Sequence, residues 1–102
     1  MSIDTGVLLM GDSKTEDLVG WAKRLESWEY NTLWLADERF FREVYSSLTI
    51  CALNTQNLRI GTCVTDPFSR HPALTAMAIA TIDEVSDGRA ILGLGAGIAG
   101  FY

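Results

Sequence analysis

The sequence is short of basic residues, histidine and cysteine, and each shortage makes a class of function less favourable. Only 8 lysines and arginines stand against 13 aspartates and glutamates, so the 102 residues carry a net charge of −5. No segment gathers the basic residues into a patch that could follow a line of phosphates. We therefore expect neither nucleic acid nor an anionic membrane surface as a partner.

Long apolar runs and metal-ligand clusters are also missing. The longest apolar stretches, such as residues 76–80, are far shorter than the roughly 20 residues that a membrane helix needs. Residues 1–4 lack the basic region and apolar region of a signal peptide. Cys51 and Cys63 lie twelve residues apart in apolar segments, which fits reduced core thiols better than a disulfide or a zinc site. We expect a cytoplasmic protein without a metal centre.

Short apolar runs alternate with segments of helical period along the whole chain. Strands are predicted at 6–10, 32–36, 58–64 and 90–94. These runs are apolar on both faces, as strands of a buried parallel sheet are. Because 102 residues leave room for one compact unit, we expect a single domain.

Three helices are predicted between the strands. Ser13 and Glu16 form a capping-box pattern at the start of the first helix. The expected buried face of this helix carries Leu18, Trp21, Ala22, Leu25 and Trp28. A helical period over 44–52 predicts the second helix. The third begins at Pro72, because proline suits the first helical position, and it ends at Asp87 and Gly88.

This alternation of strands and helices predicts a parallel sheet with right-handed crossovers. Both an α/β barrel and a doubly wound open sheet have this pattern, and periodicity does not separate them. Strands that neighbour each other in sequence order would indicate the barrel. In either fold a ligand binds at the carboxyl ends of the strands, so the residues that follow each strand are the candidates for function.

Two of these places carry the clearest candidates for chemistry. Asp37 and Glu38 form an acidic pair after the second strand, able to bind a ring edge or to act as acid or base. Glu38 has the alternative of pairing with Arg39 or Arg42 in solvent. Residues 95–97, Gly95, Ala96 and Gly97, leave the backbone amides open to a close ligand.

The same glycine-rich segment has a second interpretation. Residues 95–100 match the dinucleotide fingerprint G-x-G-x-x-G, which also requires a following helix and an acidic residue about 20 positions later. A dinucleotide-binding α/β protein therefore stays an alternative.

Arg70 and His71 directly precede the third helix. Arg70 is either a contact for a phosphate or carboxylate of a cofactor or a solvated charge at the helix start. We expect His71, placed before Pro72, to cap or pack the helix and not to donate a proton.

Three motifs resemble a known family. Residues 61–72, which read GTCVTDPFSRHP, resemble the third strand and following loop of luciferase-like flavin or deazaflavin oxidoreductases. The match is nearest to the deazaflavin-dependent, methylenetetrahydromethanopterin reductase-like branch, with Asp66 and Ser69 standing where that branch typically has asparagine and threonine. Residues 35–38 and 88–97 resemble the end of the second strand and the fourth strand of the family.

The resemblance implies a fold and a cofactor. The fold is the N-terminal part, about four strands and three helices, of a parallel (β/α)8 TIM barrel, with residues 1–102 as an N-terminal fragment of that one domain. The cofactor is FMN or the 8-hydroxy-5-deazaflavin coenzyme, at which a hydride is transferred or oxygen is activated toward a small-molecule substrate. It would lie against a non-proline cis peptide at Cys63–Val64, with Thr65 beside it.

The resemblance also shows two departures from the family. Glu38 stands where deazaflavin members often have histidine. Glu29 stands after the first helix where members usually have glycine, so a left-handed backbone there would strain the helix end.

A closed barrel typically takes about 250 residues. Three hypotheses follow: an oxidoreductase with further sequence, a truncated non-catalytic relative, and a half-barrel that pairs with another half. We expect the full-length form to be a homo-oligomer and residues 1–102 alone to have no turnover.

Overall fold

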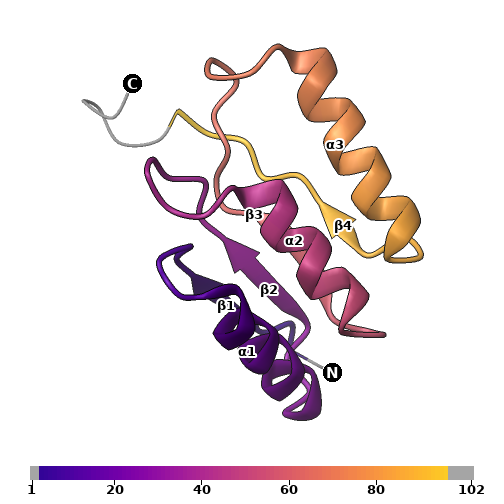
Figure 1. The fold of residues 1–102 in the computed structure, drawn as a ribbon. Helices are drawn as coiled ribbons and strands as arrows, with labels where there is room; N and C mark the ends of the chain where they lie inside the picture. The colour runs from indigo at the N-terminus through magenta and orange to yellow at the C-terminus, as the bar shows by residue number, and fades with distance from the viewer. Residues whose placement is uncertain (1–2, 97–102) are drawn as a thin grey trace.

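The computed structural model describes residues 3–96 and shows a parallel sheet with three helices packed on one face (Figure 1). The elements in order are β1 (Gly6–Leu9), α1 (Thr15–Ser27), β2 (Thr32–Leu35), α2 (Val44–Leu53), β3 (Arg59–Thr62), α3 (Pro72–Val85) and β4 (Ala90–Ile91). None of the helices in this part of the chain is long and apolar enough to cross a membrane.

The strands lie in sequence order, β1-β2-β3-β4, and every neighbouring pair is parallel. This order confirms the prediction for a barrel and does not fit a doubly wound sheet, in which a later strand pairs on the far side of β1. Each strand is shorter at its carboxyl end than predicted. β3 ends at Thr62 and β4 at Ile91, and a single bridge between Thr65 and Leu94 continues the pairing.

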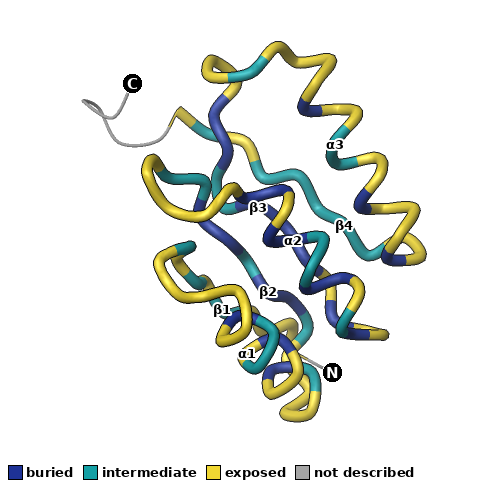
Figure 2. The backbone as a smooth tube through the Cα atoms, viewed as in Figure 1, coloured by how far each residue is buried: buried dark blue, intermediate teal, exposed yellow. Residues whose placement is uncertain are grey.

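The helices cover one face of the sheet and leave the other face open. Leu33, Leu35 and Ile60 point into the core under the helices and are almost completely buried. Figure 2 shows the buried residues concentrated in β2, β3 and the inner side of α2. A Cβ added at Gly61 would lie 2.9 Å from the Trp34 ring, so that tryptophan lies across the sheet on the face without helices.

Two predictions for α1 were wrong: the capping box at its start and the burial of its two tryptophans. The residue that caps the helix is Lys14, which makes no side-chain capping bond, so Ser13 and Glu16 do not form a capping box. Trp21 and Trp28 are 41% and 58% exposed instead of buried. The buried stripe is narrow, since in the described chain α1 has a helical neighbour, α2, on one side only.

Two predictions about helix ends are confirmed: the cap at the start of α3 and the strained residue at the end of α1. His71 precedes Pro72, and its Nδ1 accepts a hydrogen bond from the amide of Ala73 at 3.1 Å. Glu29 follows α1 with a φ of 63°, the left-handed region in which a non-glycine residue pays roughly 1 kcal/mol or more.

At the amino ends of the strands, Arg89 ties three segments together. Its Nε donates to the Ser86 carbonyl at 2.6 Å, and Nη1 donates to Thr55 Oγ1 at 2.8 Å and to the Leu58 carbonyl at 2.7 Å. Nη2 donates to the carbonyls of Ala52 and Thr55, each at 3.0 Å. All five N–H groups of the guanidinium are therefore engaged, and two of the acceptors lie at the carboxyl end of α2.

Glu26, near the end of α1, holds the loop that leads into β3. Its carboxylate accepts hydrogen bonds from three successive amides: Gln56 at 3.0 Å, Asn57 at 2.6 Å and Leu58 at 2.8 Å. Burial acts to raise the pKa of Glu26, but these amides, led by Asn57, outweigh it and lower the pKa below its ordinary value of 4.5.

We expect Glu26→Gln to lower the free energy of unfolding by about 1 to 2 kcal/mol at neutral pH, because charged hydrogen bonds become neutral ones. A carboxyl with a lowered pKa stabilises the fold fully above its ordinary value and loses that effect as the pH falls through the folded-state pKa. The deficit should hold above pH 4.5 and shrink below it. Urea denaturation across pH, with the exposed Glu84→Gln as control, measures this. An unchanged deficit at acid pH would refute the charge-based account.

Candidate active site

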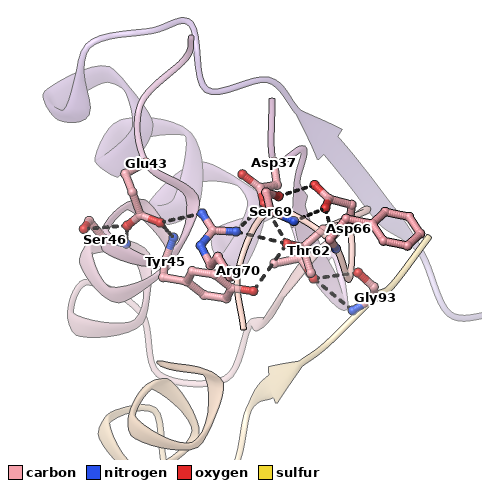
Figure 3. Close-up of polar contacts among 11 residues, drawn as sticks. Asp37, Glu43, Tyr45, Ser46, Thr62, Asp66, Ser69, Arg70 and Gly93 are labelled. Carbon is pink, nitrogen blue, oxygen red and sulfur yellow. Dashed lines mark hydrogen bonds and ion pairs between the residues drawn. The ribbon is translucent and has the colours of Figure 1, made fainter. Parts of the chain in front are cut away.

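The loops after β2 and β3 bring four polar side chains together at the carboxyl ends of the strands, and Figure 3 shows three of them, Asp37, Glu43 and Arg70. Asp37 follows β2, Glu43 precedes α2, and Thr65 and Arg70 lie in the segment between β3 and α3. The parallel arrangement places both loops at one edge of the sheet, because the carboxyl ends of parallel strands meet there.

Asp37 is held through one carboxylate oxygen. Its Oδ2 accepts a hydrogen bond from Thr65 Oγ1 at 2.6 Å and an ion-paired hydrogen bond from Arg70 Nη1 at 2.7 Å. Thr65 is fully buried, and the Asp37 side chain is 15% exposed. Charge-assisted bonds of this length are among the strong ones in proteins, so the carboxylate is firmly oriented.

Arg70 joins Asp37 to the start of α2. Its Nη2 lies 3.3 Å from Glu43 Oε2, and its guanidinium carbon lies 4.8 Å from the centre of the Tyr45 ring. The hydrogen bond to Asp37 raises the pKa of Arg70 although burial acts to lower it. Arg70 is therefore paired with two carboxylates of the chain and is not a solvated charge, whereas its contact with a phosphate or carboxylate of a cofactor stays a prediction.

Glu43 is itself fixed by the helix that it caps. Its Oε1 accepts from the Ser46 amide at 2.7 Å and the Ser46 hydroxyl at 2.8 Å, and Oε2 accepts from the Tyr45 amide at 3.1 Å. Burial acts to raise the pKa of Glu43, but these bonds and Arg70 outweigh it and lower the pKa. Glu43 is thus a stable anion behind Arg70.

Asp66 shapes the turn that presents Arg70. Its Oδ1 accepts from the amides of Phe68 at 2.8 Å and Ser69 at 2.6 Å, and its Oδ2 accepts from the Ser69 hydroxyl. Burial acts to raise the pKa of Asp66, and the bonds from Ser69 outweigh it and lower the pKa. The carboxylate thus takes a structural part in the loop.

The segment after β3 lies against the chain after β4. The Cys63–Val64 peptide is cis, as the resemblance implied, and so is Arg39–Phe40. The Thr65 amide donates to the Gly93 carbonyl at 2.9 Å, and the Gly95 amide donates to the Thr65 carbonyl at 3.1 Å. A Cβ added at Gly95 would lie 3.0 Å from Val64 Cγ2, so the missing side chain leaves room for Val64.

The predicted site residues are partly brought together. Asp37, Val64, Thr65 and Gly95 form one connected group at the edge of the sheet. Cys63 and Glu38 are half-buried beside them, and Ala96 is exposed. Gly97, like the rest of the fingerprint through residue 100, lies outside the described residues.

The structure bears on one of the two ion pairs proposed for Glu38. Arg42 Nη1 donates to the Asp12 carbonyl at 3.0 Å, and within residues 3–96 no ion pair joins Arg42 to Glu38. The pairing of Glu38 with Arg39 stays a prediction. Glu38 is half-buried at the edge next to Asp37.

Sequence reasoning missed Glu43 and Tyr45. An acidic residue directly before a helical period is favourable at a helix N-terminus, and this signal could have indicated the role of Glu43. Nothing in the local sequence indicates the contacts of either residue with Arg70, which is 27 and 25 positions away.

The thiols and acidic groups of residues 3–96 form no metal site. Both cysteines are free, and burial raises the pKa of the Cys51 thiol to about 12, which fits the core role predicted for it.

The chain is similar to named enzymes. The family model described as luciferase-like monooxygenase matches residues 2–100. A 5,10-methylenetetrahydromethanopterin reductase from Archaeoglobus fulgidus is 45% identical over 92 residues, covering 90% of this chain and 28% of the relative. The reductase of the same name from Methanolobus tindarius is 46% identical over 77 residues, covering 76% of this chain and 24% of the relative. The chain thus spans about a quarter of the length of these curated relatives.

Solved structures share the fold. The coenzyme F420 dependent tetrahydromethanopterin reductase from Methanopyrus kandleri superimposes with a TM-score of 0.94 at 32% identity, covering 99% of this chain and 29% of that one. The oxygenating constituent of 3,6-diketocamphane monooxygenase from Pseudomonas putida, in complex with FMN, has a TM-score of 0.84 at 20% identity and covers 96% and 31%. The second likeness supports the fold alone.

Proposed function

The chain belongs to the luciferase-like monooxygenase family, and on that premise we propose that the protein is an oxidoreductase that uses a deazaflavin coenzyme or FMN. The coenzyme would lie at the carboxyl ends of the strands, where Asp37, Val64, Thr65 and Gly95 meet. The observation that carries the proposal is this connected group, because three of its members come from three different strand ends, as the active sites of barrels do.

The residues present fit a flat ring. Cys63 and Val64 offer a half-buried apolar surface, and Gly95 beside Val64 has no side chain to occupy the adjoining space. Asp37 offers a carboxylate oxygen for a polar ring edge. We assign the ring to the backbone and side chains of residues 63–65, and we assign further backbone contacts to Gly95, Ala96 and Gly97.

The deazaflavin is favoured over FMN. The relatives at 45% and 46% identity are named methylenetetrahydromethanopterin reductases, and the solved reductase at 32% identity is named coenzyme F420 dependent. When bound, such a coenzyme accepts or donates a hydride. The part of this chain is to hold the ring and orient Asp37, while Glu38, half-buried beside it, is the candidate acid or base toward a small-molecule substrate.

We also propose that the complete protein is a homo-oligomer. Helix α2 carries no charged residue, and α3 carries none before Asp83. Their outward sides expose Leu53, Leu74 and Met77 by more than half. Apolar, uncharged faces of this kind mark contact surfaces on proteins, and a second copy offers an equally uncharged face.

The test is a fluorescence titration of the protein expressed from its complete reading frame, with an 8-hydroxy-5-deazaflavin, FMN, NAD and NADP in parallel. We expect saturable binding of the deazaflavin, with FMN weaker and the nicotinamide coenzymes weakest. Tight binding of NAD or NADP without deazaflavin or FMN affinity would replace this proposal with the dinucleotide alternative. Light scattering on the same preparation gives the oligomeric state.

A further inference from the structure

The two oxygens of the Asp37 carboxylate differ in their surroundings. Oδ2 accepts one hydrogen bond from the Thr65 hydroxyl and one from an N–H of the Arg70 guanidinium. Oδ1 accepts no hydrogen bond from any side chain or amide in residues 3–96. Since the side chain is 15% exposed, Oδ1 is the oxygen left for a ligand.

Arg70 can fix Asp37 because it is fixed itself. The Tyr45 ring lies under the guanidinium at 4.8 Å, and Glu43, locked by two amides of α2, pairs with Nη2 at 3.3 Å. Figure 3 shows Arg70 between Glu43 and Asp37, with dashed contacts to both. A planar guanidinium reaches two carboxylates from two nitrogens at once, whereas a lysine ammonium is a single point charge.

We propose that Arg70 is a positioning residue for the reaction: it holds Asp37 by Oδ2 so that Oδ1 alone serves the bound coenzyme or substrate as a hydrogen-bond acceptor. This inference rests on the proposed function and deepens it. It assigns Arg70 a role through Asp37 and not through a coenzyme phosphate, because both Nη groups already contact carboxylates of the chain. It also gives Asp37 the part of a fixed acceptor instead of an acid.

The experiment compares Arg70→Ala, Arg70→Lys, Asp37→Asn and the double variant Asp37→Asn/Arg70→Ala in the protein expressed from its complete reading frame. Arg24→Ala, on the exposed side of α1, is the control for loss of one cation. Coenzyme Kd by fluorescence titration, substrate KM, kcat and the thermal midpoint are measured for each.

We expect Arg70→Ala to lower kcat about 10- to 100-fold, the scale of a misplaced catalytic group, while substrate KM changes less than about threefold. Added guanidinium should restore part of kcat. Arg70→Lys, which keeps the charge, should still lose most of kcat. The coenzyme Kd of Arg70→Ala should rise to match that of Asp37→Asn, and the double variant should be no worse than Asp37→Asn, since Arg70 acts through that carboxylate.

The outcomes separate this inference from the proposed function. A wild-type protein that binds neither deazaflavin nor FMN refutes the proposed function and this inference with it. A wild-type enzyme that binds and turns over, but whose Arg70→Lys variant keeps wild-type kcat, overturns only the role of Arg70. A double variant whose loss of kcat is the product of the two single losses also overturns only the role of Arg70. If Arg70→Ala does not fold, Arg70→Lys decides the question.

Discussion

Replacing Arg89 with lysine is expected to lower the free energy of unfolding by about 3 kcal/mol or more, because a hydrogen bond to a charged group contributes about 1.5 to 3 kcal/mol and several are lost together. The guanidinium makes five hydrogen bonds, to Ala52 and Thr55 at the end of α2, to Leu58 before β3 and to Ser86 after α3. An ammonium has three donors and no planar fork, so it leaves carbonyls near the end of α2 unpaired. Those carbonyls carry the negative end of the helix dipole, which adds to the penalty.

The measurement is urea denaturation of the complete protein, followed by circular dichroism. Arg59→Lys is the matched control, since the one ion pair of Arg59 within residues 3–96 is with Asp4, at 3.5 Å, and both side chains are well exposed. Such a surface pair contributes about 0 to 1 kcal/mol. Equal midpoints for the two variants would mean that the five bonds of Arg89 do not support the fold.

Replacing Val64 with tryptophan is expected to weaken deazaflavin binding at least about 100-fold, or roughly 2.7 kcal/mol, by filling the place proposed for the ring. Val64 is half-buried, and a single carbon at Gly95 would already approach its Cγ2 to 3.0 Å. An indole at position 64 therefore has to extend into the open side, which is the proposed binding surface.

The check is a fluorescence titration of Val64→Trp beside Tyr30→Trp. Tyr30 is exposed between α1 and β2, at the amino ends of the strands, so its replacement adds an indole without touching the site. A Val64→Trp protein that melts like the wild type and binds the coenzyme as tightly would show that the ring lies elsewhere.

The regular parts of the fold were predictable because they depend on local patterns. Four apolar runs gave the four strands, and Pro72 gave the start of α3 to the residue. The residues at which the strands end and the exposure of the Trp21 side chain were not predictable, since both depend on neighbours far away in sequence. β3 stops at Thr62 where the chain leaves the ladder, although Cys63 and Val64 are as suited to a strand as the residues before them.

Sequence patterns predicted where the site lies but not which side chains contact each other there. Asp37 and Thr65 follow strands, and a parallel sheet brings such residues to one edge. Their partners were not accessible to the same reasoning. Glu43 and Arg70 meet across 27 positions, and only the packed loops decide that the guanidinium faces Tyr45 and two carboxylates instead of solvent. Charged side chains in loops carry no periodic signal, so sequence patterns leave their pairing open.

The sequential strand order bears on how the protein is made. Gly6 pairs with Thr32, Thr32 with Arg59, and Ile60 with Ala90, so each partner was synthesised only 26 to 30 residues earlier. A strand leaving the ribosome therefore meets an edge that is already exposed, and the preceding helix can cover the new pair at once. Loop closure over such short stretches is fast and adds little entropy penalty. Growth of the sheet can keep pace with translation, one strand and one helix at a time.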